Sequence, residues 1–183
     1  MKEIAQKVLN CLQLRKAQYG DVRIIRRRTE ELTVRNETPE VVKSTESLGV
    51  GVRVYHRGGW GFAATSELTD DAFSRAVSTA LELSKASRSV RRGAEPLEML
   101  PARTGHYATP IRRNPFNVSL DDKLSLLLDT TRLMLKERNV KITLGFLDFF
   151  AEEKYFADTT GSFLTQDLVE TGGGILAYAM DKD

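Results

Sequence analysis

The stretch Leu48–Leu68, LGVGVRVYHRGGWGFAATSEL, predicts a β-hairpin. Valines occupy alternate positions in Val50–Val54, and this period of two gives a strand one apolar face. The segment Arg57–Gly59 supplies the turn, because glycine adopts positive φ at little steric cost. Large and small residues alternate again in Trp60–Ala63 on the returning strand. The fold is therefore expected to contain a tight antiparallel hairpin at this point.

Three amphipathic helices are predicted around the hairpin. Apolar residues at helical spacing place them at about Lys2–Lys16, Thr69–Ser87 and Ser119–Arg138. Ser66 or Thr69 is placed to cap the second helix, and the third opens with a serine at capping-box spacing from an aspartate. Leucines dominate the apolar stripe of the third helix, which predicts packing against a core.

A basic strand precedes the hairpin. It opens at Val22, carries the cluster Arg26–Arg28, and ends where Asn36–Pro39 turns the chain. The arginines have two interpretations: contact with nucleic acid, or the solvated edge of a strand, where charge discourages aggregation. Without interleaved aromatic residues or a reading helix the cluster is poor evidence for DNA binding. We therefore expect a solvated edge.

The chain is predicted to divide into a first helix–strand–hairpin–helix unit at residues 1–87, a linker or loop at 88–117, and a second helix-plus-strands unit at 118–183. Four of the five prolines fall in Ser87–Asn117, which shows no sustained periodicity. His106 is expected to be exposed in this loop. An alternative is that its arginines attract an acidic partner or a peptide terminus: Arg88, Arg91, Arg92, Arg103, Arg112 and Arg113.

The second unit resembles the first. At a spacing of 123 residues, three positions of the hairpin strand recur: Gly49, Gly51 and Tyr55 correspond to Gly172, Gly174 and Tyr178. Two related helix-plus-sheet units would give an α+β fold, with a largely antiparallel sheet and helices on one face. The second copy stops at Met180–Asp183, where its turn would follow, so we expect a truncation there.

Length and composition are those of an ordinary globular protein of one domain or two small ones. Of the 183 residues, 41% are hydrophobic and 28% charged, and the formal charge of +2 gives no reason to expect binding of nucleic acid or a membrane. No segment approaches the roughly 20 apolar residues of a membrane-spanning helix. The single cysteine, Cys11, lies on the apolar face of the first helix, so we expect it to be a small core residue. A chain with one cysteine also fits a reducing, cytoplasmic setting.

No catalytic, cofactor-binding or metal-binding residue is assigned. In a strand, Asp148, Glu152 and Asp158 would share a face and Glu153 would point away, but alternating charge predicts a hydrated surface. A catalytic zinc site needs about three converging ligands. The two histidines, His56 and His106, are far apart in sequence, and neither is followed by glutamate.

The hairpin region resembles the amino-terminal part of the TldD/PmbA family, the "modulator of DNA gyrase" proteins, which are described as metallopeptidases. The similarity extends from about Tyr19 onward, apart from Ser87–Asn117, and a weaker match lies in Tyr155–Gln166. The residues that carry it are Asn36, Ser44–Ser47, Gly49–Arg53, Gly59–Ala63, Thr65 and Leu68.

The resemblance implies that this chain is the non-catalytic front region of a longer zinc-dependent metallopeptidase. The family's H-E-x-x-x-H helix and its distant cysteine lie downstream of this region, so zinc is expected in the full-length protein and not in this chain. The implied substrates are peptides or unfolded proteins, cleaved in peptide maturation or proteolysis. The implied assembly is a homodimer or a heterodimer with a family paralogue, in which this region shapes the substrate cleft and the subunit contact.

Two alternatives stay open. A metal-free PmbA-like partner subunit or interaction module would share the same front architecture, and an intact downstream metal motif would exclude it. A DNA-associated regulator is the third option, which the absence of salt-sensitive binding to duplex DNA would exclude.

Overall fold

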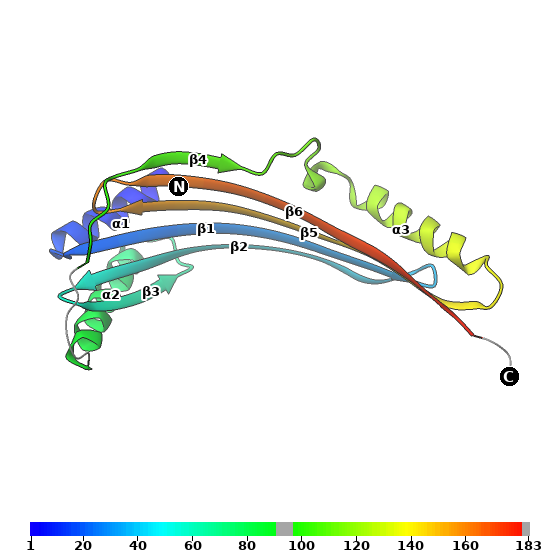
Figure 1. Ribbon diagram of the computed structural model, residues 1–183, viewed down its shortest axis with the longest axis horizontal. Helices are drawn as coiled ribbons and strands as arrows, with labels where there is room; N and C mark the ends of the chain where they lie inside the picture. The colour runs from blue at the N-terminus through cyan, green and yellow to red at the C-terminus, as the bar shows by residue number, and fades with distance from the viewer. Residues whose placement is uncertain (91–96, 181–183) are drawn as a thin grey trace. The chain divides into compact units, whose positions relative to one another are not determined.

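Four long strands form the centre of a six-stranded sheet with the order β3-β2-β1-β5-β6-β4. The structure, a computed structural model, describes residues 1–90 and 97–180. The predicted α+β class with a largely antiparallel sheet is confirmed. The elements are α1 (Lys2–Leu14), β1 (Tyr19–Arg35), β2 (Thr38–His56), β3 (Gly59–Thr65), α2 (Asp70–Val90), β4 (Thr104–Ala108), a 3-10 turn (Pro115–Asn117), α3 (Leu120–Leu135), β5 (Val140–Asp158) and β6 (Phe163–Ala179) (Figure 1).

The chain forms two compact units, each assembled from several segments. Unit 1 contains Met1–Arg26, Ser47–Ala108 and Glu153–Asp167, and unit 2 contains Arg27–Glu46, Thr109–Glu152 and Leu168–Asp183. Each of the four long strands contributes residues to both units. The division by sequence at residues 1–87, 88–117 and 118–183 stays a prediction.

The predicted hairpin is confirmed. β2 and β3 pair antiparallel from Val50 opposite Thr65 to His56 opposite Gly59. The connecting turn uses positive φ at Arg57 (48°) and Gly58 (94°). β1 and β5 also run antiparallel, since the Thr159 N–H donates to the Gly20 carbonyl at 2.9 Å and the Asn36 N–H donates to the Thr143 carbonyl at 3.1 Å. β4, in contrast, lies parallel to β6 over Phe163–Asp167.

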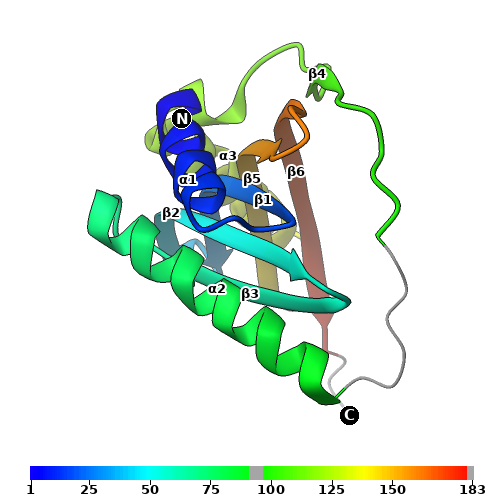
Figure 2. The same cartoon turned by 90° about the vertical axis from the view of Figure 1, so that its left-hand side faces the viewer.

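In unit 1, α1 and α2 pack on one face of the sheet, in contact with each other (Figure 2). The buried valines of the hairpin strand meet Val8 and Leu12 of α1 and Phe73 and Val77 of α2 in one apolar cluster. Cys11 packs against this cluster, as predicted. Helix α2 crosses β3 closely at Gly59 and Gly61. A Cβ atom at Gly61 would lie 2.0 Å from the Ala80 carbonyl oxygen, so the site requires glycine.

In unit 2, α3 covers a smaller apolar cluster in which Leu127 meets Leu32 and Val34 of β1. The predicted cap is present, because the Ser119 hydroxyl accepts a hydrogen bond from the Asp122 N–H at 3.1 Å. A buried ion pair joins the helix to the sheet: Lys123 Nζ lies 2.6 Å from Glu30 Oε1. The Lys123 ammonium also lies 4.4 Å from the centre of the Phe149 ring.

Two sequence predictions about edges and loops are wrong. Arg26–Arg28 lie on β1, which has a strand on each side in the sheet, so they are not at an edge. All three are exposed, as expected. Arg27 lies 2.7 Å from Glu152 of the neighbouring strand β5, and Arg28 lies over the ring of Phe116 in the 3-10 turn. The expected loop at 88–117 contains β4, and His106 lies exposed on that strand. Five residues paired to β6 carry too little periodicity to be detected from sequence. Arg91, Arg92 and Glu95 lie outside the described residues.

The prediction of a hydrated carboxylate face is also wrong in part. Asp148 is exposed, but Glu152 and Asp158 are buried. Burial is possible because each carboxylate has its own donors: Arg27 for Glu152, and the turn residues Thr160 and Ser162 for Asp158.

The order helix, long strand, long strand occurs twice, as α1–β1–β2 and α3–β5–β6. This arrangement agrees with the two predicted helix-plus-sheet units, while their origin by duplication stays a prediction. No helix within residues 1–90 and 97–180 is long and apolar enough to cross a membrane.

Candidate functional site

A cleft of about 350 Å³ lies in unit 1. Its polar groups come from strand ends and from the turn between β5 and β6, and its apolar wall includes the segment Leu97–Pro101 that leads into β4. The volume is within the range of small-molecule and side-chain pockets. Aromatic and aliphatic residues form most of the lining: Tyr19, Trp60, Leu97, Met99, Leu100, Pro101, Phe156 and Leu164.

An ion pair between neighbouring strands lies at one side of the cleft. Asp21 on β1 is 1% exposed, and its Oδ2 accepts from Arg53 Nε at 2.8 Å and lies 2.7 Å from Arg53 Nη2. Such two-point contact fixes the guanidinium in orientation as well as in position. The Arg53 guanidinium then lies 4.6 Å from the centre of the Trp60 ring. Asp21 therefore compensates the charge of Arg53 and holds it against the indole.

Three aromatic rings meet at the same place. Tyr19 contacts Trp60 edge to face at 5.9 Å between ring centres, and Tyr55 lies 5.1 Å from Trp60. Burial, together with the negative charges of Asp21 and Asp158, raises the pKa of Tyr19 to about 12. The Tyr19 hydroxyl is therefore neutral at physiological pH and offers a hydrogen-bond donor to the cleft.

Asp158 closes the turn that borders the cleft. Its Oδ1 accepts hydrogen bonds from the Thr160 N–H, the Thr160 hydroxyl and the Ser162 N–H at 2.7–2.9 Å. Burial alone would raise the pKa of this carboxyl, but the donors from Thr160 and Ser162 outweigh it and the pKa is lowered. The turn also needs Gly161, whose φ is 101°. Asp158 is thus an ionised group that fixes the turn.

A second cleft of about 410 Å³ adjoins the first, because Phe156 and Leu164 line both. The paired strands β4 and β6 supply most of its lining, and Lys154 on β5 supplies a charge. His106 Nδ1 lies 2.8 Å from the Thr165 hydroxyl at this place. Together the two clefts make a continuous aromatic and aliphatic surface within unit 1.

The chemistry of this surface is that of binding. Of its charged groups, Arg53 is paired with Asp21 and Asp158 is hydrogen-bonded within its turn. Glu98, Arg103 and Lys154 also line it, next to exposed apolar side chains such as Leu164 at 38% exposure. In the part of the chain that the structure describes, no three His, Cys, Asp or Glu side chains converge to hold a metal ion.

The cleft residues were not predicted from sequence. The sequence patterns single out neither Asp21 nor Arg53 as a site residue. Their pairing depends on the register of β1 against β2, which no pattern in either strand specifies. Of the carboxylates that the sequence singled out, Asp148 and Glu152 belong to unit 2, and Asp158 belongs to unit 1.

Comparison with known proteins gives a family match over part of the chain. Residues 20–84, which include the hairpin and the Asp21–Arg53 pair, match the sequence model described as PmbA/TldA metallopeptidase domain 1. The resemblance seen in the hairpin motif is therefore confirmed.

The chain is also similar to the protein named Metalloprotease MJ0996 of Methanocaldococcus jannaschii. The two are 25% identical over 172 residues, which is 90% of this chain and 38% of the relative. This chain thus spans well under half of the length of that protein.

Solved structures share the fold of this chain. A protein of Bacteroides thetaiotaomicron described as a modulator of DNA gyrase matches with a TM-score of 0.80 at 12% identity, over 100% of this chain and 42% of its own. A protein of Thermotoga maritima with the same description matches with a TM-score of 0.69 at 14% identity, over 100% and 40%. TldE of Thermococcus kodakarensis matches with a TM-score of 0.58 at 14% identity, over 92% and 37%.

Proposed function

We propose that this chain is the non-catalytic amino-terminal region of a metallopeptidase of the PmbA/TldD type, and that the paired clefts of unit 1 hold part of an extended peptide substrate. The metal, zinc by family resemblance, would be bound by residues outside this chain. The match of residues 20–84 to a metallopeptidase first domain supports the class of protein. The name of the archaeal relative, a metalloprotease, supports it as well.

The observation that carries the peptide-binding role is the lining of the clefts. An extended peptide presents side chains alternately on two sides, with amide groups between them. The clefts offer aromatic and aliphatic side chains that an apolar peptide side chain would cover, with Leu164 exposed between them. The neutral Tyr19 hydroxyl supplies a donor for a peptide carbonyl. Free strand edges could also pair with an extended peptide through main-chain hydrogen bonds.

Fluorescence anisotropy tests the proposal with the whole 183-residue chain. The probe is a fluorescein-labelled 12-residue peptide of alternating leucine and threonine, blocked at both termini. We expect saturable binding, weakened at least tenfold by Leu164→Glu, which puts a charge between the two clefts. The matched control is Leu133→Glu, at an exposed leucine of α3 that lines neither cleft, and it should bind as the unmodified chain does.

Two results would contradict the proposal. The first is equal affinity of the Leu164→Glu and Leu133→Glu variants, because binding would then not use the clefts. The second is cleavage of the probe by the chain with added Zn²⁺, followed by mass spectrometry, because the region would then be catalytic by itself. Matching urea-unfolding midpoints for the two variants would show that both are folded.

A further inference from the structure

One carboxylate of the first cleft is buried without a cation beside it. Asp158 lines the cleft and is 7% exposed. Hydrogen bonds from the β5–β6 turn outweigh the effect of burial and lower its pKa, so it is ionised at neutral pH. Within residues 1–90 and 97–180 it forms no salt bridge. Buried charges are ordinarily paired with an opposite charge, so this carboxylate is suited to a cation from outside the chain.

The turn occupies only one of the two carboxylate oxygens. The three hydrogen bonds from Thr160 and Ser162 all end on Oδ1. Because a carboxylate has about four acceptor sites, Oδ2 has acceptor capacity left. In the part of the chain that the structure describes, His56 Nδ1 is the only fully buried side-chain nitrogen or oxygen without a hydrogen-bond partner. Oδ2 is therefore not sealed inside the protein and can be reached from the cleft that Asp158 lines.

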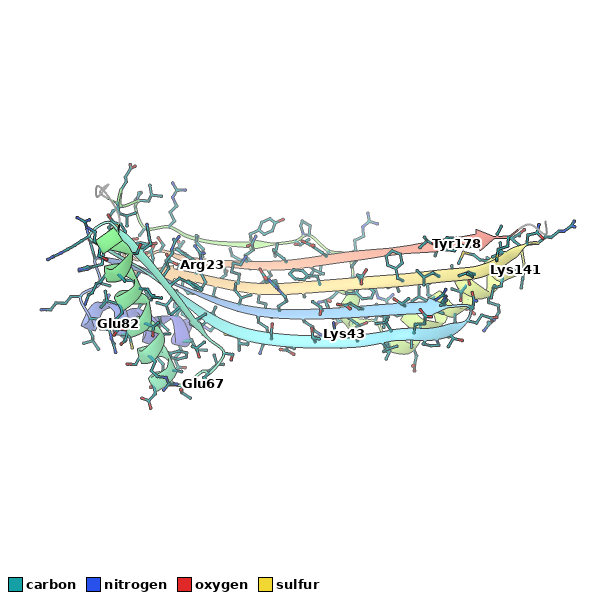
Figure 3. All side chains as sticks on the ribbon, turned by 90° about the horizontal axis from the view of Figure 1, so that it is seen from below. Arg23, Lys43, Glu67, Glu82, Lys141 and Tyr178 are labelled. Atoms are coloured by element: carbon teal, nitrogen blue, oxygen red, sulfur yellow. The ribbon has the colours of Figure 1, made fainter. Side chains whose placement is uncertain are left out.

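The arginines near this end of the sheet are held by a different carboxylate. Arg53 Nη2 lies 2.7 Å from Asp21, and Arg23 Nε lies 3.8 Å from it. Arg23, which Figure 3 labels on β1, also lies 5.6 Å from the centre of the Phe156 ring. Both guanidinium groups are thus placed beside Asp21, and Asp158 is left as an enclosed anion of the cleft.

The walls of the cleft suit a positive charge carried on a hydrocarbon chain. Three aromatic rings line it: Tyr19, Trp60 and Phe156. The faces of such rings attract cations, and their carbon atoms cover apolar groups. Glu98 and Arg103 line the cleft as well, but both are exposed and their charges are opposite. The buried carboxylate therefore decides which charge the enclosed part of the cleft favours.

The single available oxygen favours an ammonium group over a guanidinium group. A guanidinium binds a carboxylate best through two parallel hydrogen bonds, one to each oxygen. Here Oδ1 of Asp158 already accepts from three donors. An ammonium is a compact charge that needs only one acceptor oxygen at a time.

We propose that the first cleft binds a primary ammonium group of the peptide substrate, either its amino terminus or a lysine side chain, with Asp158 Oδ2 as the acceptor. This inference rests on the proposed function, because it takes a peptide in the clefts as given. It deepens that function by naming the chemical group that the first cleft selects.

Three peptides with the same 12-residue leucine–threonine sequence and fluorescein at the carboxyl end test the inference by anisotropy at pH 7. One is acetylated at its amino terminus, one has a free amino terminus, and one is acetylated but carries a lysine in place of a central threonine. We expect a free ammonium group to tighten binding about tenfold relative to the fully blocked peptide, as a hydrogen bond to a charged group would. Which of the two charged peptides shows this gain identifies the source of the ammonium.

Variants of the chain then locate the ammonium group. In Asp158→Asn the gain should fall to less than about twofold, while the blocked peptide binds as before. Glu98→Gln is the matched control, because it makes the same chemical change at an exposed carboxylate of the same cleft and should keep the gain. Leu164→Lys leaves the β5–β6 turn untouched and places a cation in the cleft, so it should remove the gain even if Asp158→Asn does not fold.

The outcomes separate this inference from the proposed function. Equal affinity of the unmodified chain for all three peptides overturns the inference, and a blocked peptide that still responds to Leu164→Glu leaves the proposed function standing. A gain that survives in Leu164→Lys or in a folded Asp158→Asn, or that is lost in Glu98→Gln, also overturns the inference. Absence of binding by all three peptides overturns both.

Discussion

At the scale of single residues, the glycines of β3 set how closely α2 approaches the sheet. Gly61→Ala would place a methyl group 2.0 Å from the Ala80 carbonyl and 2.4 Å from the Ser84 nitrogen, both backbone atoms. Because a backbone cannot swing aside as a side chain does, we expect the free energy of unfolding to fall by about 3 kcal/mol. Urea denaturation measures the change.

Gly49→Ala is the control for this prediction. Its added methyl group would meet only the Thr65 carbonyl at 3.8 Å, an ordinary contact, so the free energy of unfolding should change by less than about 1 kcal/mol. Equal urea-unfolding midpoints for Gly61→Ala and Gly49→Ala would contradict the close packing of α2 on β3.

Asp158 makes a second residue-scale prediction, on pH. Its pKa is lower in the folded chain than the ordinary value of 3.8. The ionised carboxylate therefore stabilises the fold above that ordinary value, and this contribution is lost as pH falls through the lower folded pKa. We expect Asp158→Asn to be less stable at pH 7 but to lose less stability between pH 7 and pH 2.

Urea-unfolding midpoints at the two pH values measure this difference. Asp148→Asn is the control, since Asp148 is exposed and should leave the pH dependence unchanged. If Asp158→Asn and the unmodified chain lose the same stability between pH 7 and pH 2, the hydrogen bonds from Thr160 and Ser162 do not lower the pKa of the carboxyl.

Residue patterns also show what sequence could predict. The alternation of valines in the hairpin and the serine before the third helix are local signals, so the β2–β3 turn and the α3 cap agree with the structure. The Asp21–Arg53 pair and the Arg27–Glu152 pair join different strands. Which residues face each other depends on strand order and register, and the sequence around either residue does not predict its partner.

At the scale of elements, α3 is held to the sheet of unit 2 through a buried ion pair. Lys123 and Glu30 have side chains 4% and 11% exposed. Lys123→Met alone would leave the Glu30 carboxylate buried without its cation, and we expect the free energy of unfolding to fall by about 3 kcal/mol. Urea denaturation monitored by circular dichroism measures it.

The double variant Lys123→Met with Glu30→Leu is the matched control. Replacing both charges by apolar groups removes the unpaired carboxylate, so stability should return to within about 1 kcal/mol of the unmodified chain or exceed it. A double variant that is no more stable than Lys123→Met would contradict this account of how α3 docks.

The elements also mark where sequence reasoning fails. The amphipathic helices were placed within a few residues of their observed ends. β4 was missed because a five-residue exposed strand is specified by its partner β6 and not by its own pattern. The arginines of β1 were assigned to an edge because an edge strand and an inner strand with one hydrated face can have the same sequence pattern.

At the scale of the molecule, the chain combines a region that matches a family model with a surface suited to peptide side chains. Residues 20–84 carry the family match and contribute residues to both units. The two clefts lie in unit 1, and Arg53 and Trp60 of the matched region line the first of them. The proposed substrate contact is therefore assigned to unit 1.

Amide hydrogen exchange, measured with and without the alternating leucine–threonine peptide, tests the central claim most directly. If unit 1 holds the peptide, the peptide should slow exchange around the clefts, in Leu97–Ala108 and at the β5–β6 turn, while α3 is unchanged. Slowing confined to α3, or no slowing at saturating peptide, would contradict the assignment of the clefts as the substrate-binding surface.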